Sequence, residues 1–123
     1  MGQASPFKPI ALVVEDDFWQ RELVVTLLEE SGMGVIQCES AEAAMSVLEK
    51  IGRGIALMFT DVNLAGRMSG VELAHFAMRR FASLHVIVTS GLSLKESLPE
   101  GALFFPKPWL SLDVLREAER SQH

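Results

Sequence analysis

Four short apolar runs in this sequence, which are typical of buried strands, each carry or precede side chains that can do chemistry. The runs with these side chains are 10–14 with Glu15-Asp16-Asp17, 55–60 with Asp61, 86–90 with Thr89-Ser90, and 103–106 with Lys107. In a parallel sheet the carboxyl ends of the strands share one edge, so we expect these groups to converge. The pattern therefore predicts an α/β fold with a cation and phosphate site.

The length of 123 residues predicts one domain, 1–123, with a core over about 9–120. The net charge of −5 and the absence of a basic stripe argue against direct binding of nucleic acid. A single cysteine, Cys38, is typical of a reducing compartment. No apolar stretch approaches a membrane span, and 1–9 lacks the pattern of a secretory leader. We expect a soluble cytoplasmic protein without a membrane partner.

Segments of helical period separate the apolar runs. The spacing of Trp19, Leu23 and Leu27 predicts a first helix, and a weaker strand follows at 34–38. Helix starts are predicted at Asp17 with Gln20 three residues on, at Ser40, at Ser69 with Glu72 as a capping box, and at Ser111. Alternating strands and helices predict a doubly wound, flavodoxin-like parallel sheet of five strands in the order 2-1-3-4-5.

In that order a ligand binds between strands one and three, which carry the acidic residues. Carboxylates crowded at one edge repel one another unless a cation neutralises them. Oxygen ligands of this kind suit Mg²⁺, which accepts carboxylates, a carbonyl and several waters. Asp17 needs no such role, because helix capping explains it.

Several motifs together resemble the receiver domains of two-component response regulators, over 10 to about 120. They are Val13-Val14-Glu15-Asp16-Asp17, Thr60-Asp61-Val62-Asn63-Leu64, Ser69-Gly70-Val71-Glu72-Leu73, Val88-Thr89-Ser90 and Phe105-Pro106-Lys107-Pro108-Trp109. The resemblance implies that Asp61 accepts a phosphoryl group and that Thr89 and Lys107 contact it. It also implies a cis peptide bond before Pro108.

The resemblance further implies a Mg²⁺ (or Mn²⁺) site formed by Glu15, Asp16, Asp61 and the backbone carbonyl of Asn63. The implied partners are a histidine kinase or histidine phosphotransfer protein and an unknown downstream protein. Thr89 and Phe104 occupy the positions of the family's switch pair. Because phenylalanine has no hydroxyl, a switch here must act through packing.

Two regions depart from the usual family pattern. The segment 62–69 is one residue longer than the commonest spacing, with Ala65 at the usual proline position, which predicts a looser loop. Only 90–106 separates Thr89 from Lys107, and Pro99 and Gly101 interrupt it. We therefore expect a short or irregular fourth helix in a mobile segment.

These features favour a stand-alone receiver that catalyses phosphoryl transfer to its own aspartate and is otherwise not an enzyme. One alternative is a receiver excised from a hybrid histidine kinase or a transcription factor. Another is a Mg²⁺-dependent phosphatase of the dehalogenase type, although that class needs an aspartate where this chain has Asn63. A flavodoxin-like redox carrier is disfavoured, because the acidic residues after the first strand would repel phosphate.

Overall fold

The computed structural model describes residues 8–123, in which five parallel strands form one sheet in the order β2-β1-β3-β4-β5. Residues 1–7 lie outside the described residues. They belong to the expected domain and to the segment 1–9, in which we expect no secretory leader. The strands are β1 (Ile10–Val14), β2 (Gly34–Cys38), β3 (Ile55–Asp61), β4 (His85–Ser90) and β5 (Leu103–Pro106). The predicted fold class and strand order are confirmed.

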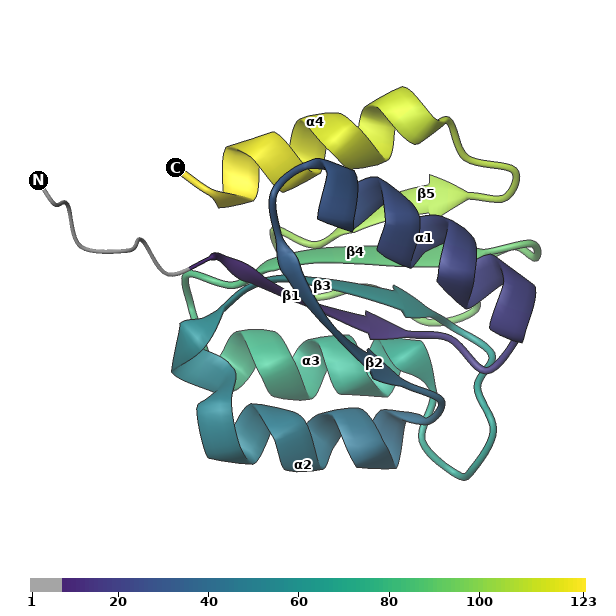
Figure 1. Ribbon diagram of the computed structural model, residues 1–123. Helices are drawn as coiled ribbons and strands as arrows, with labels where there is room; N and C mark the ends of the chain where they lie inside the picture. Colours follow the sequence, from purple (N-terminus) through teal and green to yellow (C-terminus); the bar gives the residue numbers. More distant parts are fainter. Residues whose placement is uncertain (1–7) are drawn as a thin grey trace, which may run out of the picture.

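Helices cover both faces of the sheet (Figure 1). They are α1 (Phe18–Glu30), α2 (Ala41–Ile51), the short 3₁₀ helix η1 (Gly52–Gly54), α3 (Gly70–Arg80) and α4 (Ser111–Ser121). Helices α1 and α4 pack on one face, and α2 and α3 on the other. None of the helices in residues 8–123 combines the length and the apolar character that a membrane crossing needs.

The sheet separates two apolar clusters. Alternate residues of the central strands point to opposite faces, so that Leu12 joins the cluster under α2 and α3 while Val13 joins the one under α1 and α4. The strands are buried on both sides, which explains why they appear in the sequence as continuous apolar runs. This packing holds the carboxyl ends of β1, β3 and β4 together at one edge.

Side-chain caps fix three of the helix starts as predicted, and at α1 the cap is Asp17, which accepts from the Gln20 amide. Ser40 accepts from the Ala43 amide at the start of α2, and Ser69 forms a complete capping box with Glu72 at the start of α3. The prediction for α4 was wrong, because its N-cap is Leu110, which makes no capping bond. Ser111 is the first residue inside that helix.

Helix α1 forms where the spacing predicts it, but the predicted stripe does not face the core. Trp19 is 78% exposed and Leu23 is 53% exposed. The buried side chains of this helix are instead Val24, Val25 and Leu28. Two apolar stripes run along α1, and periodicity alone does not decide which one packs on the sheet.

The segment 91–102 between β4 and β5 contains no helix, which confirms the irregular form of the expected element. Gly101 has a φ of +94°, in the left-handed region that favours glycine, and Pro99 precedes it closely. The His75 ring of α3 bonds to the Ser97 carbonyl at 2.9 Å, and Leu98 packs against the core. These contacts attach an irregular segment to α3.

Candidate functional site

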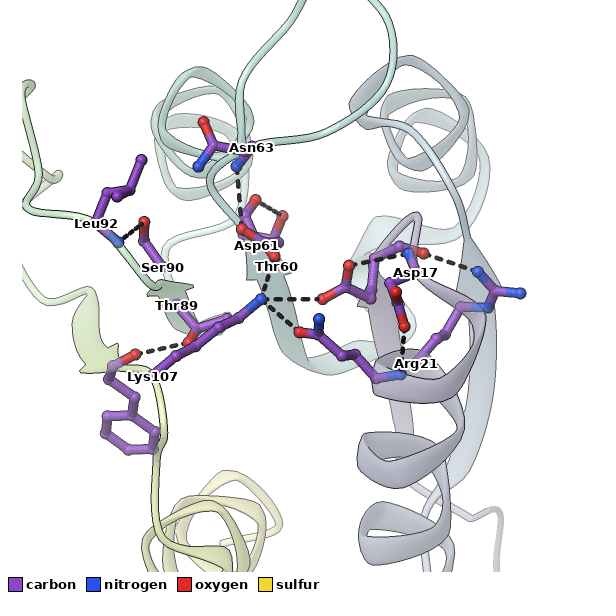
Figure 2. A network of polar contacts seen from close by, with 12 residues as sticks. Asp17, Arg21, Thr60, Asp61, Asn63, Thr89, Ser90, Leu92 and Lys107 are labelled. Atoms are coloured by element: carbon purple, nitrogen blue, oxygen red, sulfur yellow. Dashed lines mark hydrogen bonds and ion pairs between the residues drawn. The ribbon is translucent and has the colours of Figure 1, made fainter.

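Three of the predicted side chains meet at the carboxyl edge of the sheet (Figure 2). Lys107, which follows β5, places its Nζ 2.6 Å from Oδ2 of Asp61 and 3.6 Å from Oε1 of Glu15. Asp61 ends β3, and Glu15 directly follows β1. Both carboxylates are almost fully buried, and most of the Lys107 side chain is covered. The expected convergence of acids and lysine is therefore present.

Asp61 is held at both oxygens of its carboxylate. The Asn63 amide donates to Oδ1 at 3.0 Å, while Lys107 occupies Oδ2. A Cβ at Gly70 would lie 1.9 Å from the Asp61 carbonyl oxygen, so only glycine permits α3 to start this close to the strand end. The local backbone thus gives Asp61 one orientation, with its carboxylate facing Lys107.

Glu15 is fixed by the turn that leads into α1. Its Oε2 accepts the Asp17 amide at 3.1 Å, and Arg21 donates from Nη1 to its backbone carbonyl at 2.9 Å. Burial is the main cause that raises the pKa of Glu15 to about 7. The Asp17 amide opposes this shift, while the nearby charge of Asp61 adds to it and Lys107 reduces it.

Lys107 stays charged despite its partial burial. Desolvation is the largest effect and lowers the pKa of the ammonium, but the hydrogen bond and charge of Asp61, together with Glu15, outweigh it and raise the pKa above its ordinary value. The Lys107–Pro108 peptide bond is cis, as the resemblance implies. The Lys107 ammonium thus faces two carboxylates, those of Asp61 and Glu15.

Three other predicted site residues lie apart from this contact. Asp16 is exposed, and no group of three or more His, Cys, Asp or Glu side chains in residues 8–123 is arranged to hold a metal ion. The Thr89 hydroxyl donates to the Phe105 carbonyl at 2.6 Å. Phe104 is half-buried on β5, beside Val88 in the β4–β5 register. The structure therefore brings Glu15, Asp61 and Lys107 together directly.

Gln20 is a site residue that sequence reasoning missed. Its Oε1 accepts from Lys107 Nζ at 2.5 Å, so it does not complete a capping box at α1. The Asp17 amide, which a capping box would use, is bonded to Glu15 instead. A glutamine three residues after a helix cap, beside an acidic pair, was the available signal.

The loop after β3 is better held than its length predicts. Glu42 of α2 accepts the amides of Arg67 and Met68, each at 3.0 Å. A bond from its own backbone amide is the main cause that lowers the pKa of Glu42, and these two bonds add to the effect. Gly66 has a φ of +97°, and a Cβ there would lie 2.7 Å from Glu42 Oε1. Glu42 thus holds the segment that carries Asn63.

Comparison with known proteins identifies the family of this chain. The family described as the response regulator receiver domain matches residues 11–103, which is most of the chain. The chain belongs to this receiver family. A putative two-component response regulator of Arabidopsis thaliana, ARR21, is 34% identical over 118 residues, which cover 94% of this chain and 19% of that protein. The receiver thus spans about a fifth of the length of that relative.

Solved structures with the same fold include other receivers. A response regulator receiver protein from Sinorhizobium medicae has a TM-score of 0.83 at 18% identity, covering 93% of this chain and 94% of that one. The receiver domain of the hybrid histidine kinase CckA has a TM-score of 0.78 at 24% identity, covering 93% and 99%. At these identities the likeness shows the fold alone.

The family implies Mg²⁺ at the acidic edge, and the donor set of this receiver fits such an ion. The carboxylate oxygens of Glu15 and Asp61 converge, since Lys107 Nζ forms an ion pair with both. Mg²⁺ usually binds one or two carboxylates and keeps several waters, so two converging carboxylates suffice. The raised pKa of Glu15 reflects a buried acid whose charge Lys107 alone does not fully offset.

Proposed function

We propose that this receiver accepts a phosphoryl group on Asp61 from the phosphohistidine of a histidine kinase or histidine phosphotransfer protein. The observation that supports this best is the pairing of a buried strand-end carboxylate with a lysine at 2.6 Å. A carboxylate fixed beside a cation can act as a nucleophile toward phosphorus while the cation offsets charge on the transferred oxygens.

In the proposed reaction an oxygen of Asp61 forms a bond to phosphorus, and the bond from phosphorus to the imidazole nitrogen breaks. The electron pair of that bond leaves with the imidazole, and the product is an aspartyl phosphate. Lys107 then exchanges its contact with Asp61 Oδ2 for a phosphoryl oxygen. Mg²⁺ held by Glu15, Asp16, Asp61 and the Asn63 carbonyl would neutralise charge on the phosphoryl oxygens.

In this proposal, signalling follows from a change of hydrogen-bond partners at the carboxyl edge of the sheet. The Thr89 hydroxyl donates a hydrogen bond to the Phe105 carbonyl in the structure. A phosphoryl oxygen is a stronger acceptor because it is charged, so we expect Thr89 to turn toward it. The packing of Phe104 would then adjust and alter the surface seen by a downstream protein. No tyrosine hydroxyl takes part, since the chain contains none.

The chain acts as a stand-alone receiver in this proposal. The alternative of a receiver from a longer protein has a specific observation in its favour, because the chain covers 19% of its Arabidopsis relative. The two differ in what the phosphorylated surface contacts, which is either a separate protein or a further domain. The site chemistry is the same in both.

Incubation with acetyl phosphate, with and without Mg²⁺, tests the proposal by intact mass. We expect one added phosphoryl group that requires the metal and is lost in Asp61→Asn. Asp113, which lies on α4 and outside the site, offers a matched control, since Asp113→Asn makes the same chemical change there. Phosphorylation that persists in Asp61→Asn would contradict the assignment, and steady hydrolysis of many phosphomonoesters would favour the phosphatase alternative.

A further inference from the structure

We propose that Gln20 is a positioning residue for Lys107. Its side-chain carbonyl accepts one N–H of the ammonium at 2.5 Å and so holds that group beside Asp61. The inference concerns the unphosphorylated chain, and only its importance for phosphoryl transfer rests on the proposed function. It assigns a role to a side chain that sequence patterns place in a helix cap.

A closed ring of contacts fixes Gln20 in this place. Glu15 Oε2 accepts the Asp17 amide at 3.1 Å, and Asp17 Oδ1 accepts the Gln20 amide at 2.9 Å. Gln20 Oε1 then accepts from Lys107, whose Nζ lies 3.6 Å from Glu15 Oε1 and closes the ring. The cap of α1 and the ammonium are thus parts of one network (Figure 2).

The ring matters because a lysine side chain is hard to hold by charge alone. Its ammonium sits on a flexible four-carbon stem, and ordering that stem costs conformational entropy. Asp61 provides one strong contact, while Glu15 at 3.6 Å is beyond hydrogen-bond distance. Gln20 supplies the second hydrogen bond, from helix α1. Its backbone is held by Asp17, so only the torsions of its side chain have to be ordered for this contact.

An acceptor at position 20 therefore makes a testable difference to the Lys107 ammonium. With it, two N–H groups are bonded to protein and exchange slowly with water. Without it, we expect the ammonium to move between Asp61 and solvent. One such hydrogen bond changes the exchange and labelling rates by roughly 2- to 10-fold.

The experiment observes lysine ammonium ¹⁵N signals by NMR in the full chain, without metal or phosphodonor. The other lysines, Lys8, Lys50 and Lys95, are exposed and serve as internal references. We expect a slowly exchanging signal from Lys107 in the wild type. It should be lost in Gln20→Met, which keeps the side-chain length, and retained in Gln20→Glu, which keeps an acceptor.

A matched control is Gln37→Met, since Gln37 lies on β2, accepts from Arg21 and is not hydrogen-bonded to Lys107. This variant should leave the Lys107 signal unchanged. Trace acylation of lysines followed by mass spectrometry gives a second readout, with labelling of Lys107 raised roughly 2- to 10-fold in Gln20→Met only. An identical Lys107 signal in wild type and Gln20→Met, or loss of the signal in Gln20→Glu, would overturn the inference.

These measurements separate the inference from the proposed function. If acetyl phosphate fails to modify Asp61 while the Lys107 signal behaves as expected, the phosphoacceptor role fails and the positioning role stands. If Asp61 is phosphorylated while the Lys107 signal is the same in wild type and Gln20→Met, only the positioning role is contradicted.

Discussion

Replacing Glu15 by glutamine should stabilise the metal-free protein at high pH and change little at low pH. Glu15 is buried beside Asp61, and burial raises its pKa from 4.5 to about 7. A carboxyl group whose pKa is raised on folding favours the folded state while it is protonated. That contribution is fully present below about pH 4.5 and is lost as the pH rises through about 7. Above that pH the folded protein must hold a poorly compensated charge.

The size of the effect follows from the shift itself. A change in pKa from 4.5 to about 7 corresponds to about 3 kcal/mol of unfolding free energy. Glutamine has the shape of the protonated acid and keeps an oxygen for the Asp17 amide. We therefore expect Glu15→Gln to exceed the wild type by about 3 kcal/mol at about pH 8 and to equal it at about pH 4.

Urea unfolding followed by circular dichroism, in the presence of a chelator, measures both free energies. Glu39→Gln is the matched control, because it removes the same charge from an exposed site. It should change the free energy of unfolding by less than about 0.5 kcal/mol at either pH. A Glu15→Gln protein that is less stable than the wild type at about pH 8, or a stability difference that does not depend on pH, would refute the reasoning.

Substitutions at three further positions test other parts of the site. Gly70→Ala places a Cβ against the Asp61 carbonyl, so we expect a loss of about 2–4 kcal/mol in thermal or urea unfolding; an unchanged midpoint would contradict this. Glu42→Ala should speed hydrogen exchange at the two loop amides that it binds, with Glu42→Gln intermediate, and equal rates in all three proteins would argue against the contact. Lys107→Ala should weaken the phosphorylation-dependent change in tryptophan fluorescence, and a full-sized change would refute the role of the lysine.

The sheet could be predicted because its strands have few alternatives. Runs such as 55–60 are buried on both faces, and only a parallel sheet covered by helices accommodates several of them. The same reasoning placed Glu15, Asp61 and Lys107 at one edge, because parallel strands end together. Capping signals at Ser40 and Ser69 were also sufficient, since each bond is local.

The remaining features depend on packing that the sequence does not reveal. Helix α1 has apolar side chains on two sides, so its spacing was compatible with burying either Leu23 or Val24. Gln20 suits a capping box, but the Asp17 amide is taken by Glu15, which leaves the glutamine side chain free for Lys107. The hydrogen bonding of Glu42 to the loop after β3 joins segments that are far apart in the chain.

The central claim is that Asp61 receives the phosphoryl group, and chemical trapping of the phosphorylated residue tests it most directly. Borohydride reduces an aspartyl phosphate to homoserine, which peptide mass mapping locates. After treatment with acetyl phosphate and Mg²⁺, we predict homoserine at position 61 and nowhere else, with none formed when the phosphodonor is omitted. Homoserine at Asp16 or Asp17, or phosphate found only on another residue type, would contradict the account.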